Sequence, residues 1–278
     1  MEGRMKISII TVSYNAVTTI EQTISSVVNQ SYPDIEYIII DGGSTDGTVD
    51  VIRKYEDRIA YWVSEPDGGI YAAMNKGISV ATGDYVYFLG ADDCLADYDV
   101  ISNVVDDIKI ETADIYSYGV YMVSENAKQK YIGNKERLKN TSFPGMIPHQ
   151  GMFAKRTLTL KFRFDLAYKI LADYKFYLQC LAEKDIKIVY KKESVAFFSL
   201  SGISGTNLEI MKTESEKLAN ELGFEYRENP STGYRYYIKE ILKKMGLLAF
   251  LKSIRDGYGW KKHKCNNKIC RWCRRYNP

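Results

Sequence analysis

The sequence has few of the residues that build disulfide frameworks. Its 278 residues include only five cysteines, of which Cys94 and Cys180 stand alone, while the other three cluster near the C-terminus. Small secreted domains are typically stabilised by several paired cysteines. The observed distribution therefore does not fit a secreted, disulfide-rich domain.

Long apolar segments are also absent. No stretch approaches the roughly 18–20 uninterrupted apolar residues that cross a bilayer as a helix. The first residues run directly into an apolar, β-branched segment, without the basic start, apolar stretch and cleavage site of a secretory signal. We therefore expect a cytoplasmic protein, either free or peripheral at the inner face of the cell membrane.

Acidic residues are missing from the C-terminal end. The net charge of the whole chain is +3, but every charged residue from Lys261 onward is Lys or Arg. An apolar stripe at helical spacing (238–249) and the aromatic side chains of Trp260 and Trp272 lie in or near this basic tail. Such a combination is typical of a peripheral contact with an anionic membrane surface. A helix packed on the body, followed by a solvated basic end, is the alternative interpretation.

Two further interpretations of the tail have weaker support. The residue types of His263, Cys265, Cys270 and Cys273 would suit a small zinc knot, but their spacing is imperfect and no second cysteine pair precedes them. No nucleic-acid-binding motif accompanies the basic residues, so we expect no nucleic-acid partner.

Apolar segments of strand and helix type alternate through the first 95 residues. A short β-branched run is followed by apolar residues at helical spacing, and this order repeats. Such alternation predicts an α/β fold with parallel, right-handed βαβ units. The expected strands are 6–12, 36–40, 59–63 and 85–89, and the expected helices are 20–28, 48–55 and 70–81. Further on, we expect strands at 115–123 and 186–190, a helix at 171–183, and helical structure from residue 206 onward.

Polar side chains follow the expected strands where each one ends. They are Asn15, Asp41, Asp67, Asp92 and Asp93. Because ligands of parallel sheets bind beyond the carboxyl ends of the strands, we expect these side chains to gather at one binding edge.

The pair Asp92-Asp93 is a candidate cation site. Adjacent carboxylates on a tight turn suit a hard divalent cation that also contacts the phosphate oxygens of a substrate. On its own, an Asp-Asp pair after a strand is more often a turn or a helix cap. The other acidic strand ends give the cation interpretation its weight.

The loop that follows Asp41 (residues 42–47) admits three interpretations. It does not fit an EF-hand, because Gly43 and Thr45 stand where carboxylates or amides belong. It does not fit a dinucleotide site either, since the Gly-x-Gly-x-x-Gly pattern after the first strand is missing. The third interpretation is contact between Asp41 and a nucleobase and ribose, with small residues that let the ligand approach closely.

Four short motifs follow one another along the first part of the chain. They are Thr11-Val12-Ser13-Tyr14-Asn15, Ile40-Asp41-Gly42-Gly43-Ser44-Thr45-Asp46-Gly47-Thr48, Gly83-Asp84-Tyr85 and Leu89-Gly90-Ala91-Asp92-Asp93. In this order and at this spacing they resemble the family 2 glycosyltransferases with the GT-A fold, a resemblance that covers roughly two thirds of the chain.

A further segment, 65–77, resembles a branch of that family that builds bacterial surface polysaccharides, except that Ala72 stands where the branch commonly has Asp. A packing role for Ala72 on its helix is as good an explanation as altered donor contacts.

The resemblance implies roles for the residues of these motifs. Asp41 would bind the nucleobase, Asp92 would serve the ribose, and Asp93 would hold a diphosphate-bound Mg²⁺ or Mn²⁺. The other residues expected to contact the nucleotide-sugar donor, which we expect to be a UDP-sugar, are Thr11, Ser13, Asn15, Asp67, Asn75 and Lys76.

A second set of residues resembles the acceptor half of the same family. In Pro148-His149-Gln150-Gly151, we expect His149 and Gln150 to contact the acceptor, although a simple hydrogen-bonding role fits His149 equally well. The resemblance implies that Asp173 is the general base that removes the proton of the acceptor hydroxyl. Asp165 is the alternative base, which we expect instead to shape its loop, and a plain surface charge is the other interpretation of Asp173.

Together these observations predict an inverting glycosyltransferase of cell-surface polysaccharide synthesis, with a glycan or lipid-linked saccharide as acceptor. We expect a nucleotide-sugar-binding half (1–95), an acceptor-binding half (96–205) and a helical, basic C-terminal extension (206–278). The central sheet should be Rossmann-like, mostly parallel and flanked by helices. Two rival hypotheses are an inactive nucleotide-sugar-binding protein and a nucleotidyltransferase, and the missing glycine-rich, basic phosphate loop counts against the second.

Overall fold

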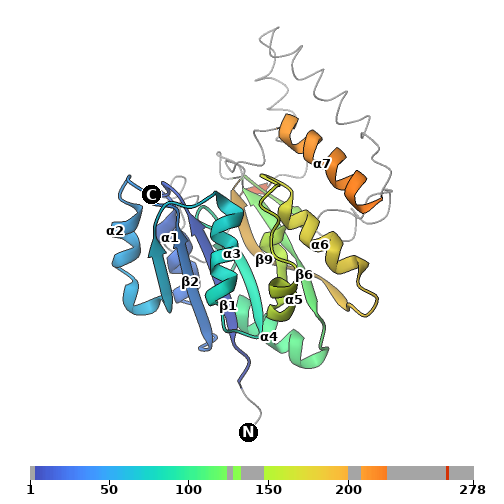
Figure 1. Cartoon of the computed structure of the whole chain (residues 1–278). Coiled ribbons are helices and arrows are strands. Elements are labelled where there is room, and N and C mark those ends of the chain that lie inside the picture. The colour runs from blue at the N-terminus through green and yellow to red at the C-terminus, as the bar shows by residue number, and fades with distance from the viewer. Residues whose placement is uncertain (1–3, 124–127, 133–146, 200–207, 224–260, 263–278) are drawn as a thin grey trace.

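The computed structural model describes residues 4–123, 128–132, 147–199, 208–223 and 261–262 (Figure 1). The expected zinc ligands (263–273) lie outside these residues, as does nearly all of the basic tail. Among the described residues, no helix is both long enough and apolar enough to cross a membrane.

Four parallel strands form the first part of the sheet, as the sequence predicted. They lie in the order β4-β1-β2-β3, and every strand of this group except β3 is almost wholly buried. Strands buried on both faces read as continuous apolar runs, which explains why their sequences show no alternation of polar and apolar residues. The bounds are Ile7–Ser13 for β1, Ile35–Asp41 for β2, Tyr61–Ser64 for β3 and Tyr85–Gly90 for β4.

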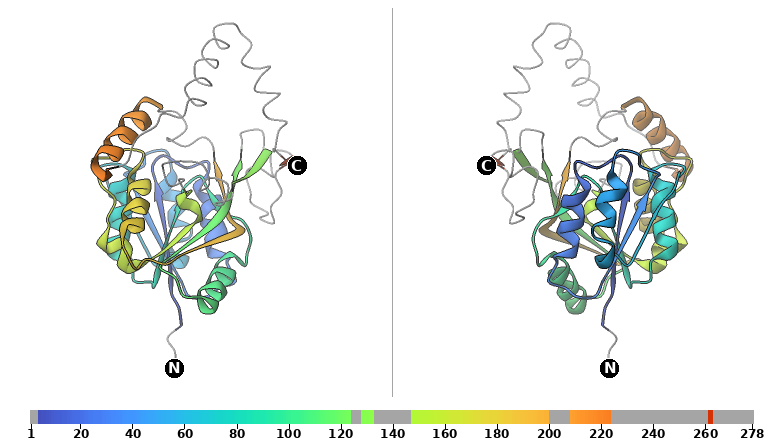
Figure 2. Two further views of the ribbon diagram at one scale, coloured as in Figure 1. Left: turned by 90° about the vertical axis from the view of Figure 1, so that its right-hand side faces the viewer. Right: turned by 90° about the vertical axis from the view of Figure 1, so that its left-hand side faces the viewer.

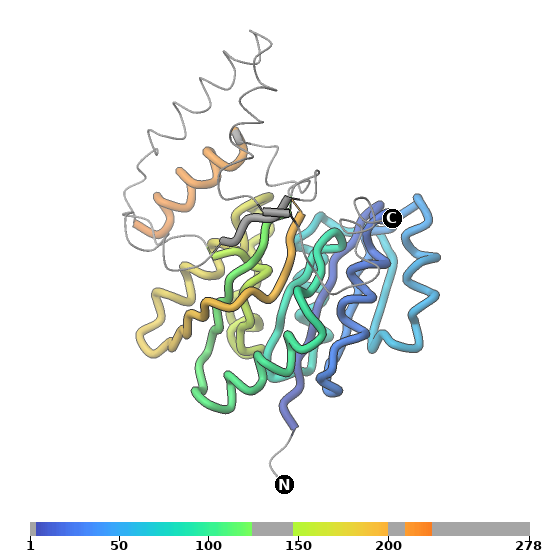
Figure 3. Tube along the Cα trace, turned by 180° about the vertical axis from the view of Figure 1, so that it is seen from behind, coloured from blue at the N-terminus to red at the C-terminus, as the bar shows by residue number. Residues whose placement is uncertain are grey.

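Helices cover both faces of this sheet (Figure 2). Alternate residues of each strand point to opposite faces, so Ile9 of β1 packs with α1 (Ile20–Val28), α2 (Thr48–Arg53) and α4 (Val100–Ile110). Its neighbour Ile10 packs with α3 (Ile70–Val80), α5 (Arg156–Lys161) and α6 (Ala172–Ala182). Figure 3, which views the molecule from the side opposite to Figure 1, shows the face covered by α1, α2 and α4. The result is the three-layer α/β architecture that the sequence predicted.

The second half extends the same sheet with strands of mixed direction. Strand β8 (Met152–Lys155) runs antiparallel to β4, and β6 (Ile115–Val123) runs antiparallel to β8. Strand β9 (Ile188–Ser199) lies parallel to β6 and also pairs with the short β5 (Cys94–Leu95). Strand β7 (Lys128–Ile132) pairs antiparallel with β6, and the 3₁₀ turn η2 (His149–Gly151) precedes β8. The expected strand at 186–190 was therefore much too short.

Smaller corrections concern element ends. The helix expected to reach residue 55 ends at Arg53 and is followed by a 3₁₀ turn, η1 (Glu56–Arg58), while the strand expected at 59–63 runs instead from Tyr61 to Ser64. Shifts of a few residues are usual, because a pattern of apolar residues does not determine the exact residue at which a helix or strand ends. Both buried cysteines outside the tail lie in the body of the fold, where Cys94 accepts a hydrogen bond from Gln22.

The C-terminal extension is helical only in part. Helix α7 (Leu208–Leu222) packs on the α6 side, with Leu218 in the same apolar cluster as α3 and α6 (Figure 1). Lys261–Lys262 forms strand β10, which pairs antiparallel with β7, so the expectation of helix from residue 206 onward was wrong there. The two main apolar clusters contain residues from both sides of the expected boundary at 95, and the one that includes Leu218 also crosses the boundary at 205. Within the residues that the structure describes, the three expected parts of the chain therefore do not have separate hydrophobic cores.

Candidate active site

The carboxyl ends of the parallel strands meet at one edge of the sheet. Ser13 at the end of β1 pairs in register with Asp41 of β2, and Asp41 pairs with Ser64 of β3. On the other side of β1, the chain leaves β4 at Gly90 and turns into Asp92 and Asp93. This edge is where an α/β sheet binds its ligand.

Asp41 is the organising residue of the first part of this edge. It is 0% exposed, and its carboxylate accepts hydrogen bonds from the hydroxyls of Ser13 (2.8 Å), Ser44 (2.6 Å) and Ser64 (2.7 Å). The backbone N–H groups of Gly43 (3.1 Å) and Ser44 (2.8 Å) also donate to it. Burial alone would raise the pKa of Asp41, but these hydrogen bonds outweigh burial and lower it. The carboxylate thus holds three strand ends and their loop together.

Asp41→Asn should destabilise the fold as well as weaken nucleotide binding. An amide cannot accept all five hydrogen bonds, so we expect the free energy of unfolding to fall by about 3 kcal/mol. Because the folded-state pKa lies below the ordinary value, the carboxylate contributes its stability above pH 4 or so and loses it as pH falls further. Urea unfolding at pH 7 and at pH 3 measures the free energy of unfolding of both proteins. The difference between wild type and Asp41→Asn should be smaller at pH 3. Asp50→Asn, at an exposed position of α2, should change the free energy of unfolding little at either pH.

Asn15 and Asp67 lie on the loops that border Asp41. Asn15 has a φ of 48° and accepts a hydrogen bond from the N–H of Thr45. Asp67 is exposed and accepts one from the N–H of Gly69. Its Oδ2 would lie 3.0 Å from a Cβ added at Gly42, so a larger residue at position 42 would require the Asp67 side chain to shift slightly.

Three other residues expected to contact the donor form contacts within the protein. Thr11 is fully buried within β1, where its hydroxyl lies 3.2 Å from that of Tyr37. The amide of Asn75 on α3 exchanges two hydrogen bonds with the backbone of Phe164. Lys76 pairs with Glu65. In this structure these residues fasten elements to one another, and their expected contact with the donor remains untested.

Asp93 sits in a tight turn at the end of β4. It is 3% exposed, and its N–H donates to the carbonyl of Gly90 (3.0 Å). Its Oδ1 accepts a hydrogen bond from the N–H of Ser199 (3.0 Å), and its Oδ2 accepts one from Nε2 of Gln150 (3.2 Å). Asp92 is the more exposed of the two carboxylates. Asp93 is therefore held in place by the protein, and Asp92 beside it is only partly buried.

The electrostatics of this pair favour a bound cation. Burial and the nearby Asp92 carboxylate raise the pKa of Asp93 to about 7, against the opposing effects of Ser199, His149 and Gln150. Among the described residues, no Lys or Arg forms an ion pair with Asp93, and no three His, Cys, Asp or Glu side chains form a complete metal site. Mg²⁺ and Mn²⁺ prefer oxygen ligands, and Mg²⁺ is commonly held by one or two carboxylates plus substrate phosphates. The donor set of Asp92 and Asp93 fits such a cation.

Gly90→Ala should disturb this pair directly. A Cβ at Gly90 would meet Oδ2 of Asp93 at 2.7 Å and Oδ1 of Asp92 at 3.2 Å, so both carboxylates must move. We expect activity to fall by about 10²-fold, as for other misplacements of about 1 Å in an active site. Steady-state kinetics at saturating Mn²⁺ measures the loss. Wild-type kinetics would show that the two carboxylates need not keep these positions.

Asp173 lies in the first turn of α6 and is 8% exposed. Its Oδ1 accepts a hydrogen bond from the N–H of Tyr174 (2.9 Å) and lies 3.0 Å from the hydroxyl of Tyr71. Its Oδ2 lies 3.0 Å from Nδ1 of His149. Asp165 instead accepts hydrogen bonds from Lys175 and the N–H of Ala167, which fits the expected role in shaping its loop.

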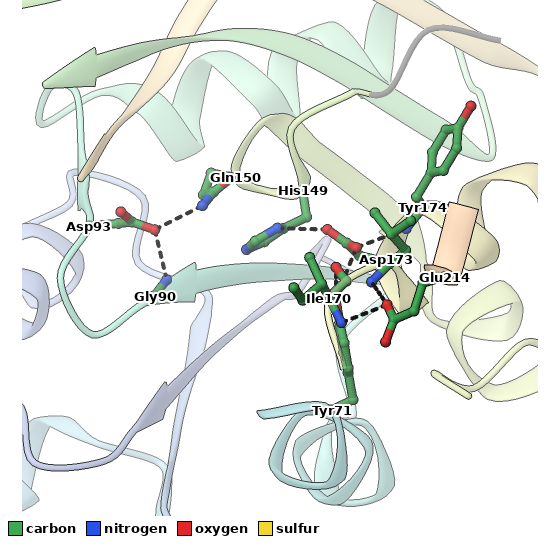
Figure 4. Close-up of polar contacts among 10 residues, drawn as sticks. Tyr71, Gly90, Asp93, His149, Gln150, Ile170, Asp173, Tyr174 and Glu214 are labelled. Carbon is green, nitrogen blue, oxygen red and sulfur yellow. Dashed lines mark hydrogen bonds and ion pairs between the residues drawn. The ribbon is translucent and has the colours of Figure 1, made fainter. Parts of the chain in front are cut away.

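Consecutive residues of η2 connect the two buried carboxylates (Figure 4). His149 contacts Asp173, and Gln150 donates to Asp93. The turn itself is anchored, because the carbonyl of Gln150 accepts a hydrogen bond from the hydroxyl of Tyr87 (2.7 Å). A Cβ at Gly151 would lie 2.4 Å from a backbone oxygen of β6, so the turn packs directly on the sheet.

The carboxylates around η2 affect the pKa of His149. Burial would lower the pKa of His149, but the Asp173 carboxylate, with the more distant Asp93 and Asp92, raises it. The site therefore brings the candidate metal carboxylates and the candidate base into one hydrogen-bonded unit. The expected contact of His149 and Gln150 with an acceptor is not tested by this geometry.

Several residues of this unit had no assigned role in the sequence. Tyr71 belongs to the recognised segment 65–77, but a single hydroxyl carries no signal of its partner. Ser199 takes part through its backbone, which no pattern of side chains reveals. Glu214 of α7 also contacts the region of Asp173, and its position on an apolar helix face was a signal that could have found it.

Comparison with known proteins agrees with this description. The family described as glycosyl transferase family 2 matches residues 8–166. An uncharacterised glycosyltransferase of Mycobacterium tuberculosis is 33% identical over 192 residues, which cover 64% of this chain and 70% of that protein. A PGL/p-HBAD biosynthesis glycosyltransferase of Mycobacterium bovis is 31% identical over 205 residues, with 72% and 79% of the two chains covered.

Solved structures are similar in fold at lower sequence identity. S. aureus TarS (1–349) in complex with UDP has a TM-score of 0.59 and 19% identity, covering 81% of this chain and 68% of that one. The mannosyltransferase PcManGT of Pyrobaculum calidifontis, in complex with GDP-Man and Mn²⁺, has a TM-score of 0.56 and 20% identity, with 71% and 57% covered. The sequence match, the relatives and the shared fold lead to one conclusion: this chain belongs to glycosyl transferase family 2 and is a glycosyltransferase with the GT-A fold.

Proposed function

We propose that the chain transfers a sugar from a nucleotide-sugar, most simply a UDP-sugar, to a hydroxyl of a glycan or lipid-linked saccharide, with inversion at the anomeric carbon. The observation that carries this proposal is the link through η2. His149 and Gln150 hold Asp173 and Asp93 as the two ends of one site. Glycosyl transfer needs a cation site for the leaving diphosphate and a base for the incoming hydroxyl, and these two carboxylates supply one each.

On the donor side, Asp93 would hold Mg²⁺ or Mn²⁺, and the neighbouring Asp92 would contact the ribose and add its negative charge to the cation site. The cation would neutralise the negative charge that develops on the departing nucleoside diphosphate. The hydrogen bonds of Asp93 with Ser199 and Gln150 keep its carboxylate in place before substrate arrives, so little reorganisation is needed during the reaction. Asp41 and its serine partners would shape the site of the nucleoside, with Asn15 and Asp67 on the bordering loops.

On the acceptor side, Asp173 would act as the general base. The acceptor oxygen attacks the anomeric carbon, the bond from that carbon to the diphosphate oxygen breaks, and the hydroxyl proton passes to Asp173. His149 holds Oδ2 of Asp173 and Tyr71 lies against Oδ1, so both oxygens of the base are oriented. One displacement from the opposite face inverts the anomeric configuration.

The acceptor class is inferred from relatives. The M. bovis relative is named for PGL/p-HBAD biosynthesis, and the TarS and PcManGT structures hold UDP, UDP-GlcNAc or GDP-Man. The bound nucleotides of these structures support a nucleotide-sugar as donor. The sequence resemblance and the name of the M. bovis relative favour a cell-surface glycan or its lipid-linked precursor as acceptor. Contact of the basic tail with an anionic membrane would bring the enzyme close to such an acceptor.

The test is release of nucleoside diphosphate from a panel of UDP-, GDP- and dTDP-sugars, with and without Mn²⁺ and with a glycolipid extract as acceptor. We expect metal-dependent turnover of one donor. Tight nucleotide binding without turnover of any donor would favour an inactive binding protein instead. Pyrophosphate release from a nucleoside triphosphate and a sugar phosphate would indicate a nucleotidyltransferase.

A further inference from the structure

Helix α7 carries a buried charge on its apolar face. Ile210, Met211 and Leu218 pack against the cluster formed by α3, α5 and α6. Glu214 lies on the same face, one turn from each of them, and is only 6% exposed. A carboxylate buried among apolar side chains is costly unless it is well hydrogen-bonded. Its partners therefore indicate why a Glu stands there.

Those partners are three consecutive backbone N–H groups. Oε1 of Glu214 accepts a hydrogen bond from Lys169 (2.5 Å), and Oε2 accepts bonds from Ile170 (3.0 Å) and Leu171 (2.9 Å). In the part of the chain that the structure describes, no Lys, Arg or His forms an ion pair with Glu214. The carboxylate thus binds three consecutive backbone N–H groups and fixes the path of the segment 169–171.

That segment leads directly into Asp173. Leu171 is the N-cap residue of α6, whose second residue is Asp173. The hydroxyl of Tyr71 lies 2.5 Å from the carbonyl of Ile170 and 3.0 Å from Oδ1 of Asp173, so it joins the backbone that Glu214 holds to the side chain of the base. Figure 4 shows this series of contacts from Glu214 to Asp173.

We propose that Glu214 is a positioning residue, which acts through the segment 169–171 and Tyr71 to set the orientation of Asp173 for proton transfer. The inference rests on the proposed function, in which Asp173 is the base. It assigns α7 of the C-terminal extension to the acceptor half of the active site. Removal of the Glu214 charge should therefore slow transfer without changing the binding of the donor.

The test uses the full chain, four single variants and one double variant, with the donor and acceptor found in the panel. Glu214→Gln keeps the size of the side chain but cannot accept all three N–H bonds, and we expect kcat to fall by about tenfold. The KM for the donor and the affinity for nucleotide with Mn²⁺ should not change. Glu214→Asp keeps the charge, so its kcat should fall less than that of Glu214→Gln. Glu216→Gln, on the exposed face of the same helix, should match wild type.

The fourth variant, Asp173→Asn, separates positioning from general stability. If Glu214 acts through Asp173, Glu214→Gln should cause no further loss of turnover in the Asp173→Asn background. An equal loss in both backgrounds, or a parallel loss of nucleotide affinity, would overturn the positioning role. Wild-type turnover of Glu214→Gln beside an impaired Asp173→Asn would overturn this inference alone. Wild-type turnover of Asp173→Asn would overturn the proposed function, and this inference with it.

Discussion

Asp173→Asn should lower the rate of transfer by about 10²–10⁴-fold, the usual contribution of a general base. An amide cannot take the proton of the acceptor hydroxyl. It can still accept the hydrogen bonds that the Tyr174 N–H and the Tyr71 hydroxyl give to Oδ1, so the start of α6 should keep its structure. Steady-state kinetics with saturating donor and acceptor measures the loss, and calorimetry should find the affinity for nucleotide with Mn²⁺ unchanged.

Asp165→Asn is the matched control for this variant. Asp165 contacts Lys175 and the N–H of Ala167 rather than the site formed by η2, and Lys175 keeps Glu221 as a second partner. We expect its kcat to stay close to that of wild type. The reverse result, with the larger loss in Asp165→Asn, would identify Asp165 as the base and contradict the assignment of Asp173.

Asp93→Asn should abolish the metal dependence of the reaction along with most of the activity. Neutralising the charge on the departing diphosphate is worth about 4 kcal/mol of transition-state stabilisation, which corresponds to about 10³-fold in rate. The Asn amide also places a donor against either the Ser199 N–H or the Gln150 side chain, since Asp93 accepts hydrogen bonds on both oxygens. Rates measured across a Mn²⁺ titration should therefore be low and flat.

Two measurements keep this prediction specific. Thermal unfolding shows whether the variant is still folded, and Asp106→Asn, an exposed residue of α4 paired with Lys109, should keep the wild-type titration curve. A folded Asp93→Asn protein with a normal Mn²⁺ response would place the cation elsewhere.

The sequence predicted the architecture of the first half well because its signals there are local. Buried parallel strands appear as short β-branched runs, and each helix between them shows its own apolar spacing. The order of these elements then determines that their carboxyl ends share an edge. The clustering of Asp41 with the pair Asp92-Asp93 at that edge followed from topology alone, and the family match confirms the fold.

What each side chain does at the edge could not be predicted in the same way. The expected contact of Asp41 with a nucleobase stays a prediction, and nothing in the sequence indicated that Ser13, Ser44 and Ser64, from three different segments, would bind its carboxylate. Asn75 lies within the recognised segment 65–77, but its contact with Phe164 spans 89 residues. Such partners depend on the final packing, and no local pattern records them.

The C-terminal part of the chain shows the same limit most clearly. The strand at Lys261–Lys262 forms through pairing with β7, a non-local contact that overrides the helical tendency of its surroundings. Glu214 was overlooked because exposed and buried Glu look alike in sequence. Its place one helical turn from Leu218 and from Ile210 was the available signal, since a charge on an apolar stripe requires a partner.

The anomeric configuration of the transferred sugar tests the central claim most directly. With the donor from the panel, proton NMR of the first product reports whether the bond to the acceptor has the configuration of the donor or the opposite one. A single displacement with Asp173 as base predicts the opposite configuration. Retention would require either two successive displacements or attack of the acceptor on the face that the diphosphate leaves, and would contradict the account of Asp173.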